Sequence, residues 1–235
     1  MSNLADEAWI NKLLSNYGVC SRKDANRIIE EGRVIVNGAL AFPGQWVEEY
    51  DDIFLDGEKL KPKEKIYIAL NKPIGITCTA ASDVKDNVIE YVNYPEYIFP
   101  VGRLDKPSQG LLLMTNDGDL ANGILEAENN KEKEYIVTVD RQFDDKFIKD
   151  MSNGVDIGDA ITRPCKVTRI NKNTFNIILT QGLNKQIRRM SKAFGFNVVK
   201  LERIRIMNIT IDGIEYGKWR YLSSDEINEL RENVK

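Results

Sequence analysis

The carboxylate best placed for chemistry in this sequence is Asp105, which follows Gly102-Arg103-Leu104 and precedes Lys106-Pro107-Ser108. The loop leads into an apolar stretch, Leu111 to Met114, that is typical of a buried strand. A carboxylate held by a rigid strand and open to a cleft can act as a nucleophile or a general base. The same residue types also favour a plain turn in which Asp105 caps its own backbone, and on residue types alone the turn is the commoner arrangement.

Histidine is absent from the 235 residues, which removes Ser-His-Asp and Cys-His catalysis and imidazole metal sites. The three cysteines, Cys20, Cys78 and Cys165, are too few for a four-thiolate zinc site and too scattered for a disulfide framework. No glycine-rich nucleotide fingerprint occurs, so we expect neither a metal nor a cofactor. Acid–base work must therefore fall to Asp, Glu, Lys, Tyr or Cys.

Positive charge is concentrated in one part of an acidic chain. The net charge is −3, yet the stretch from Arg163 to Arg205 holds eleven Lys or Arg residues and one acid, a local charge of +10. Such an excess can bind phosphates and steer RNA toward the protein. Four of these cations share one helical face at i, i+3, i+4 and i+7: Lys185, Arg188, Arg189 and Lys192. A solvated surface stripe is the alternative, and we prefer it for Lys192.

The sequence predicts no membrane segment. No apolar run reaches the ~18 residues needed to span a bilayer. The first ten residues have neither the basic nor the apolar region of a secretory signal. Together with the scattered cysteines, these observations favour a cytoplasmic protein, which we expect to be a monomer.

Two units must hold these side chains, and the first, residues 1–62, is predicted to be a small α+β domain. Helical spacing runs from Ile10 to Tyr17 and ends at Gly18. Ser21 is placed to cap a second helix, with Asp24 three residues later, and that helix ends at Gly32. Two strands with hairpin turns follow: Val34 to Val36 with Asn37-Gly38, and Ile53 to Leu55 with Asp56-Gly57.

The charged segment Glu58 to Lys65 indicates a linker, which we set at residues 63–66, before a second domain at 67–235. Strands clustered without regular alternation with helices favour a mixed, mainly antiparallel β-sheet flanked by helices. Helices are expected after Asp144, after Asn184 and after Ser223, the last with Glu226 in a capping box. The β-like runs are 66–70, 111–115, 135–139, 175–180 and 198–201.

The first unit resembles an S4 domain, a small RNA-binding fold found in ribosomal proteins and RNA-modifying enzymes. Residues 18–25 and 32–38 carry the likeness. The resemblance implies that Arg22, Lys23 and Arg27 face an RNA backbone. Residues 1–65 nevertheless hold nine basic and twelve acidic side chains, so binding must depend on one face rather than on bulk charge.

The second unit resembles the pseudouridine synthase family that modifies ribosomal RNA. The run from Val101 to Gly118 closely resembles the motif around that family's catalytic aspartate, and residues 71–75, 133–135 and 181–190 also match. Residues 203–208 favour the F-type subgroup, which acts on the large ribosomal subunit, over its B- and E-type relatives. With the S4 likeness, the resemblance covers almost the whole chain.

The synthase resemblance implies roles for individual side chains. Asp105 becomes the essential carboxylate, Tyr135 packs against the target base, and Arg188 pairs with the aspartate. Without the resemblance, a strand tyrosine such as Tyr135 is most simply a core aromatic. Ile187 is expected below the base, and Arg103, Lys185 and Arg189 are assigned to RNA phosphates.

The implied activity is isomerisation of one uridine in structured RNA, after the base is flipped out of its stack. The expected target is 23S rRNA, with tRNA as an additional candidate. Asp105 could attack C1′ or deprotonate C2′, and the sequence leaves both routes open. The alternatives are a non-catalytic RNA-binding or ribosome-assembly factor that retains the fold, and a regulator that uses only its S4 domain, which leaves most of the chain unexplained.

Overall fold

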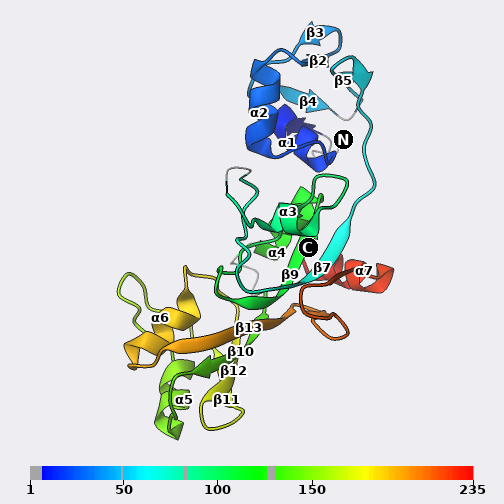
Figure 1. Ribbon diagram of the computed structural model, residues 1–235. Coiled ribbons are helices and arrows are strands. Elements are labelled where there is room, and N and C mark those ends of the chain that lie inside the picture. Colours follow the sequence, from blue (N-terminus) through cyan, green and yellow to red (C-terminus); the bar gives the residue numbers. More distant parts are fainter. Residues whose placement is uncertain (1–6, 49, 82–83, 126–130, 235) are drawn as a thin grey trace.

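The computed structural model describes residues 7–48, 50–81, 84–125 and 131–234 (Figure 1). A small N-terminal unit is joined by an extended segment to a larger unit built on one nine-stranded sheet. The predicted α+β class, with a mixed and mainly antiparallel sheet, is confirmed. Within the described ranges, none of the helices combines the length and apolar character that crossing a lipid bilayer requires.

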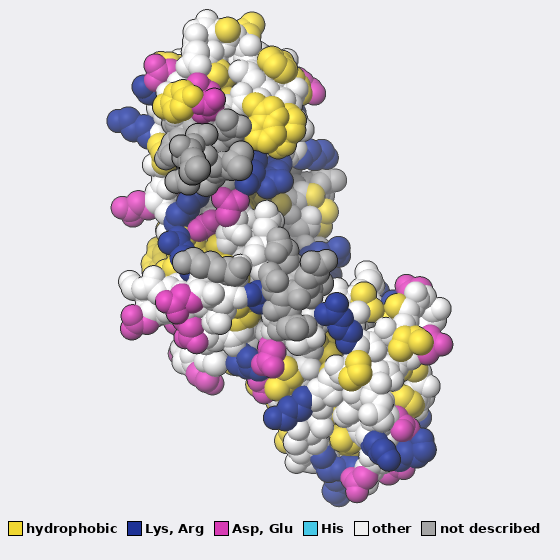
Figure 2. Space-filling view, turned by 180° about the vertical axis from the view of Figure 1, so that it is seen from behind, with side chains coloured by type: hydrophobic (Ala, Val, Ile, Leu, Met, Phe, Trp, Pro, Cys, Tyr) yellow, Lys and Arg dark blue, Asp and Glu magenta, His cyan; other side chains and the backbone are white. Residues whose placement is uncertain are grey.

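The N-terminal unit packs two helices against short strands around one apolar core. Ile10, Leu14 and Ala25 are fully buried there with Ile29 and Val34. Hydrophobic side chains also stand on its surface at the top of Figure 2. The elements are β1 (Glu7–Trp9), α1 (Ile10–Asn16), α2 (Arg22–Glu30), β2 (Val34–Val36), β3 (Ala39–Leu40), β4 (Trp46–Glu48), β5 (Ile53–Leu55) and β6 (Glu58–Lys59).

Local sequence determines where the helices and turns of this unit begin and end. The Ser21 hydroxyl accepts the Asp24 backbone N–H at 3.1 Å and so caps α2, as predicted. Asn37 and Gly38 both have positive φ, which is the backbone that a tight turn between β2 and β3 requires. The linker interpretation was wrong for Glu58 and Lys59, because β6 pairs with β5 and extends the small sheet.

The larger unit is organised by a sheet of order β11-β12-β10-β13-β9-β7-β15, with β14 paired to β13 and β8 to β9. Every pairing is antiparallel except that of β13 with β9. The strands are β7 (Tyr67–Lys72), β8 (Phe99–Pro100), β9 (Gln109–Thr115), β10 (Lys133–Val139), β11 (Lys166–Arg169), β12 (Thr174–Leu179), β13 (Val198–Ile206), β14 (Ile209–Thr210) and β15 (Trp219–Tyr221).

Alternation along β7 and β9 gives the sheet a core on each face. Ile68 and Leu112 belong to one buried cluster, whereas Ala69 and Leu111 belong to the other. All six residues of β7 are buried, and the first four, Tyr67 to Leu70, belong to the two apolar cores. The helices that accompany the sheet are α3 (Val88–Val92), α4 (Gly118–Leu125), α5 (Asp145–Ser152), α6 (Gln186–Ala193) and α7 (Ser224–Asn233).

Two of the three predicted caps in this unit are confirmed. Asp144 accepts the Phe147 N–H at 2.9 Å, and Ser223 forms a full capping box with Glu226. The Asn184 cap was wrong: the N-cap of α6 is Lys185, in a left-handed conformation with no side-chain hydrogen bond. The preceding loop is closed instead by the Leu183 N–H, which donates to the Gln186 side chain at 3.0 Å.

The two units touch through α1 and the region around α4. Lys12 Nζ lies 2.7 Å from Asp119 Oδ1, and the Tyr97 N–H donates to the Gly18 carbonyl at 3.2 Å. The ion pair is largely exposed, so it adds little stability by itself. These contacts nevertheless give the N-terminal unit a defined place on the larger one.

Gly110 is the position where the two halves of the large sheet meet. It pairs with Lys72 on β7 and with Arg203 on β13, and its φ is +107°. A Cβ built there would lie 2.3 Å from the Arg203 carbonyl oxygen and 2.7 Å from its nitrogen. Only glycine allows so close a backbone approach.

We therefore expect Gly110→Ala to lower the free energy of unfolding by about 3–5 kcal/mol, from overpacking and from the left-handed backbone. Urea denaturation measures this directly. Gly182→Ala is the matched control, since no atom lies within 4 Å of its built Cβ and its φ is ordinary. Equal stability of the two variants would contradict the close approach at this junction.

Candidate active site

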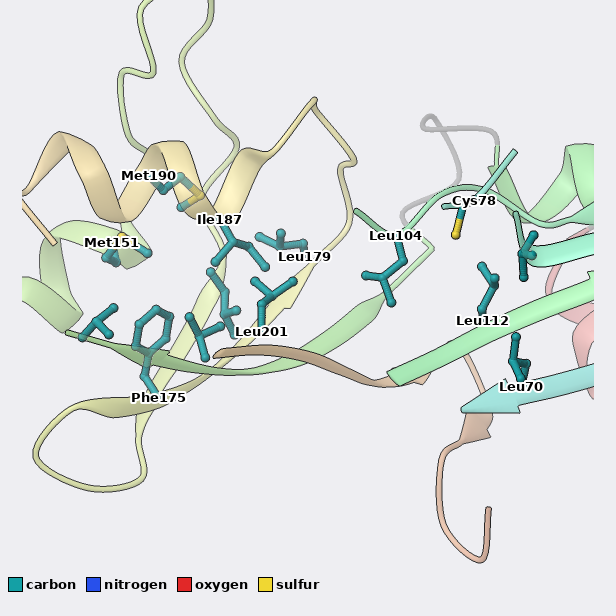
Figure 3. Close-up of a cluster of buried hydrophobic side chains, with 14 of the residues drawn as sticks. Leu70, Cys78, Leu104, Leu112, Met151, Phe175, Leu179, Ile187, Met190 and Leu201 are labelled. Atoms are coloured by element: carbon teal, nitrogen blue, oxygen red, sulfur yellow. The ribbon is translucent and has the colours of Figure 1, made fainter. Parts of the chain in front are cut away.

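A cavity of about 440 Å³ lies where the two halves of the sheet join. Its volume is within the range of about 300–1,000 Å³ usual for small-molecule sites. Most of its lining comes from the loop before β9, the region at the start of β10, the segment from the end of β12 into α6, and β13. Figure 3 shows Leu104 on one side of this region and Ile187, Leu179 and Leu201 on the other, and all four line the cavity.

Asp105 lines the cavity from the loop before β9 and is half-buried. The turn that holds it is closed by backbone, because the Ser108 N–H donates to the Asp105 carbonyl at 2.9 Å. A second backbone hydrogen bond, called the Gly75 strut from here on, supports this turn: the Gly75 N–H donates to the Lys106 carbonyl at 2.8 Å. Among the described residues, no hydrogen bond or ion pair engages the Asp105 carboxylate. The carboxylate is thus available to a ligand rather than used to cap its own turn.

Lys72 holds the segment around Gly75 in place from inside the protein, and so supports the Gly75 strut. Its side chain is fully buried, and Nζ donates to the carbonyls of Pro73 at 2.8 Å and Ile76 at 2.9 Å. Burial lowers the pKa of this ammonium, while the nearby Asp105 charge acts in the opposite direction. Lys72 therefore orders residues 73–76, which in turn hold the loop that carries Asp105.

Tyr135 and Ile187 supply flat and apolar surface beside the carboxylate. Tyr135 is half-buried on β10 and packs against the large core, and Ile187 at the start of α6 is 5% exposed. Both line the cavity together with Leu104 and Leu201. An aromatic ring next to aliphatic side chains can hold a planar base by stacking.

Arg188 does not make the direct ion pair with Asp105 that the resemblance implied. In the described part of the chain, no N···O distance within 4.0 Å joins the two groups. Its Nη2 donates to the Pro107 carbonyl at 3.2 Å and the Ser108 hydroxyl at 2.9 Å, and Nη1 donates to the Val198 carbonyl at 3.0 Å. The guanidinium is committed to the loop just after Asp105, so it fixes that loop to β13 and α6.

The cations predicted to contact RNA divide into three groups. Arg103 and Lys185 are exposed and line the cavity. Arg189 lies outside the cavity lining; it pairs with Asp159 and donates to the Ile157 carbonyl at 2.6 Å. Arg22, Lys23 and Arg27 stand exposed on α2 of the N-terminal unit, with Arg27 paired to Glu31 at 3.1 Å.

The cavity is strongly positive. Among the described residues that line it, Asp105 is the single acid, against six cations: Arg103, Lys131, Lys133, Lys185, Arg188 and Arg203. Lys and Arg side chains are also visible near the narrow junction between the middle and lower parts of the molecule in Figure 2. Such a site favours a ligand that carries negative charge.

Sequence reasoning gave no role to Lys133, Lys131 or Arg203. One signal could have found Lys133: it lies two residues before Tyr135 on the same strand, so the two side chains share a face. Arg203 lies beyond the predicted β-like run 198–201, and a buried arginine is not expected from composition.

Comparison with known proteins finds relatives that match most of this chain. Residues 9–53 match the S4 domain model, and residues 66–193 match the RNA pseudouridylate synthase model. The dual-specificity RNA pseudouridine synthase RluF of Escherichia coli K12 is 48% identical over 224 residues, which are 94% of this chain and 77% of that protein.

Two more distant proteins extend the likeness. The ribosomal large subunit pseudouridine synthase B of Bacillus subtilis is 33% identical, covering 94% of this chain and 95% of its own. A solved structure described as a pseudouridylate synthase superimposes with a TM-score of 0.69 at 28% identity, over 94% of this chain and 99% of that one.

Proposed function

The chain belongs to the RNA pseudouridylate synthase family and isomerises uridine in RNA to pseudouridine, and we propose that its target lies in 23S rRNA and that Asp105 is its catalytic carboxylate. The observation that carries the second proposal is the position of Asp105. It is the single described acid in a cavity lined by six cations, and its carboxylate has no partner among the described residues. A carboxylate without a protein partner in a positively charged cavity is free to contact a bound ligand.

The reaction breaks the bond between N1 and C1′ and joins C5 to C1′. In one route an Asp105 oxygen attacks C1′ while the bonding pair leaves with the uracil, and C5 later displaces the carboxylate. In the other, Asp105 takes the C2′ proton, the uracil leaves, and that proton returns to C2′ when C5 adds to C1′. Both routes end with loss of the C5 proton and gain of a proton at N1, so no group donor is consumed.

We propose that the extruded uracil lies between Tyr135 and the apolar side chains of Leu104 and Ile187. The base must leave its stack, which costs a few kcal/mol, and stacking on a ring returns roughly 1–3 kcal/mol. Arg188 is a positioning residue in this scheme, since its donors hold the backbone at Pro107 and Ser108. Arg103 and Lys185 are exposed at the same cavity and suit the flanking phosphates.

The RNA target is proposed from two relatives. The Bacillus subtilis relative is named for the large ribosomal subunit, and the Escherichia coli relative is named as having dual specificity. We propose 23S rRNA as the main substrate and a tRNA stem-loop of similar shape as a second one. We also propose a monomer in the cytoplasm; Cys20, Cys78 and Cys165 are all free, as suits a reducing compartment.

Pseudouridine mapping of total RNA tests the target, with cells that express or lack the gene. We expect one large-subunit position to lose its pseudouridine when the gene is deleted, and complementation to restore it. Loss confined to small-subunit RNA would overturn the target. An unchanged map, together with inactivity on isolated 23S rRNA, would favour a non-catalytic RNA-binding factor instead.

The exposed cations of α2 are expected to contribute phosphate contacts. Replacing Arg22, Lys23 and Arg27 with Gln should weaken RNA binding and flatten its salt dependence by roughly 2 in the slope of log K against log [salt], since each lost contact removes about 0.7–0.9. The single-turnover rate at saturating RNA should stay near wild type, because the cavity is untouched.

Fluorescence titration of labelled rRNA fragments at several salt concentrations provides the measurement. A control variant removes the same charge from the same unit outside α2, by replacing Arg33, Lys59 and Lys61, which are all exposed. An identical loss of affinity in both triple variants would show that bulk charge, not the α2 face, binds the RNA.

A further inference from the structure

Arg203 is a buried cation with an unused donor. It is 2% exposed, its Nε donates to the Leu111 carbonyl at 2.7 Å, and Nη1 lies 3.4 Å from the Arg103 carbonyl. Nη2 is fully buried and has no hydrogen-bond partner among the described residues. A buried charged donor without an acceptor is costly, and native proteins rarely leave one unexplained. Since Arg203 also lines the cavity, a ligand can supply that acceptor.

Lys133 is a second cation with unused donors, and it is half-buried. It lines the cavity from β10 on the same face as Tyr135, and no described residue gives its ammonium a hydrogen bond or an ion pair. Its neighbour Glu134 points to the other face and is fully engaged, by Arg205 at 2.7 Å and Asn176 at 2.8 Å. The ion pair of Glu134 therefore lies on the strand face opposite Lys133. On the cavity face, the Lys133 ammonium has no acceptor among the described residues.

The surroundings of Lys133 are mostly positive. Burial, and next the charge of Arg203, lower the pKa of the Lys133 ammonium to about 8. The loop before β9 presents Arg103 and Asp105, Lys131 precedes β10 and Tyr135 lies on it, and Lys185 and Arg188 come from the N-cap and first turn of α6. Arg103 and Lys185 are exposed, whereas Nη1 and Nη2 of Arg188 donate to Val198, Pro107 and Ser108, and its buried Nε has no partner among the described residues. Lys131 is also buried at the cavity but lies before β10; Lys133 and Arg203 are the two inner cations on the paired strands β10 and β13.

We propose that Lys133 and Arg203 together bind the carbonyl oxygens of the extruded uracil and stabilise its negative charge when the N1–C1′ bond breaks. The inference rests on the proposed role of this cavity as the uridine site. Breaking that bond leaves the electron pair on the ring, where it spreads from N1 onto the carbonyl oxygens. Donors already in place for this charge lower the barrier without reorganising. The charge is consumed when C5 bonds to C1′ and the C5 proton leaves, as N1 gains a proton.

The same pair would favour uracil over cytosine. Uracil presents an oxygen acceptor at position 4, whereas cytosine presents an amino donor there. A cationic donor facing the amino group would be left unpaired and repelled, which is the kind of mismatch that proteins use to reject a base.

Lys133→Met tests the proposal, because it keeps the length of the side chain and removes the charge. We expect the single-turnover rate on an RNA stem-loop containing the target uridine to fall by roughly 10²–10³-fold, as for loss of one preorganised donor. The Kd for the RNA should change less than about twofold, since phosphates are held elsewhere. Lys149→Met, an exposed lysine on α5, is the control and should keep the full rate.

A pH series separates this role from a structural one. If the ammonium form is active, kcat/KM of the wild type falls as the pH rises above about 8, where Lys133 loses its proton. Lys133→Arg stays charged and should hold its value to higher pH. A Lys133→Met rate within threefold of wild type, or an alkaline limb that persists unchanged in Lys133→Arg, would overturn the proposal.

Arg203 needs a gentler substitution, because its Nε and Nη1 also support the backbone. Arg203→Lys keeps the positive charge but loses the planar guanidinium and its paired N–H donors. We expect a slower chemical step with RNA affinity retained. Thermal unfolding of the same samples shows whether Arg203→Lys is still folded. If it is not, the Lys133 variants alone test the proposal. Asp105→Asn distinguishes failure of the proposed function from failure of this inference. Turnover by Asp105→Asn would rule out Asp105 as the catalytic carboxylate. An inactive Asp105→Asn together with a fully active Lys133→Met would overturn only the role proposed for Lys133 and Arg203.

Discussion

Asp105→Asn should fold, bind RNA and make no pseudouridine, with the chemical step slowed by roughly 10⁴-fold or more, which corresponds to about 5 kcal/mol of lost barrier reduction. An amide can neither form the ester at C1′ nor accept the C2′ proton, so both routes lose their reacting group. The fold should be unaffected, because the Asp105 carboxylate has no partner among the described residues. We expect the free energy of unfolding to change by about 0.5 kcal/mol or less.

Release of tritium from RNA labelled at uracil C5 measures the reaction, and thermal unfolding with RNA titration measures fold and binding. Asp86→Asn is the matched control: this acid faces Lys106 of the same loop at 3.9 Å, and its side chain is largely exposed. It should react at the wild-type rate. If Asp105→Asn retained even a few per cent of the wild-type rate, another group would have to be the catalytic one.

The parts of the fold set by local physics could be predicted from the sequence. Ser21, Asp144 and Ser223 each cap a helix through the backbone N–H three residues later, a geometry that depends on a few neighbouring residues. Asn37-Gly38 similarly determines its own hairpin. The cap proposed at Asn184 failed because the Gln186 side chain closes this turn by accepting the Leu183 N–H, and the N-cap is Lys185 at a φ of +48°.

Long-range pairing explains the features that the sequence did not predict. β13 continues to Ile206, well beyond the predicted end at residue 201, although charged residues interrupt its apolar run. Those charges are tolerated because Arg205 bonds to Glu134 across the sheet and Arg203 bonds to the Leu111 carbonyl. A pattern along one strand cannot reveal partners that lie on other strands.

The residues of the candidate site likewise divide into those that the sequence could suggest and those that only the tertiary structure reveals. Asp105, Tyr135 and Ile187 could be chosen from motif resemblance, and the structure brings them to one cavity. Lys133 and Arg203 could not, because a lysine before a strand and an arginine within one are ordinary until burial and missing partners are known. The resemblance paired Arg188 with the Asp105 carboxylate, whereas its Nη2 donates to Pro107 and Ser108 of the loop just after it.

Arg188→Ala should slow the chemical step by roughly 10²–10³-fold, equivalent to about 3–4 kcal/mol, while RNA affinity stays within a few fold. Its three donated bonds tie Pro107, Ser108 and Val198 together, and without them the loop that carries Asp105 is free to shift. Truncation also leaves the buried Ser108 hydroxyl without this donor, so we expect a loss of about 1–3 kcal/mol in unfolding free energy. Lys192→Ala, an exposed cation on the same helix, is the control and should change neither quantity.

A double-mutant cycle with Ser108→Ala distinguishes positioning from general loss of stability. Ser108 is fully buried and its hydroxyl accepts the Arg188 Nη2 at 2.9 Å, so each substitution removes the same contact. If that contact positions Asp105, the two effects on the single-turnover rate overlap, and the double variant is faster than additivity predicts by about 1 kcal/mol or more. Strict additivity of the rate effects, or an Arg188→Ala rate near wild type, would mean that Asp105 is held by its own turn and by the Gly75 strut alone.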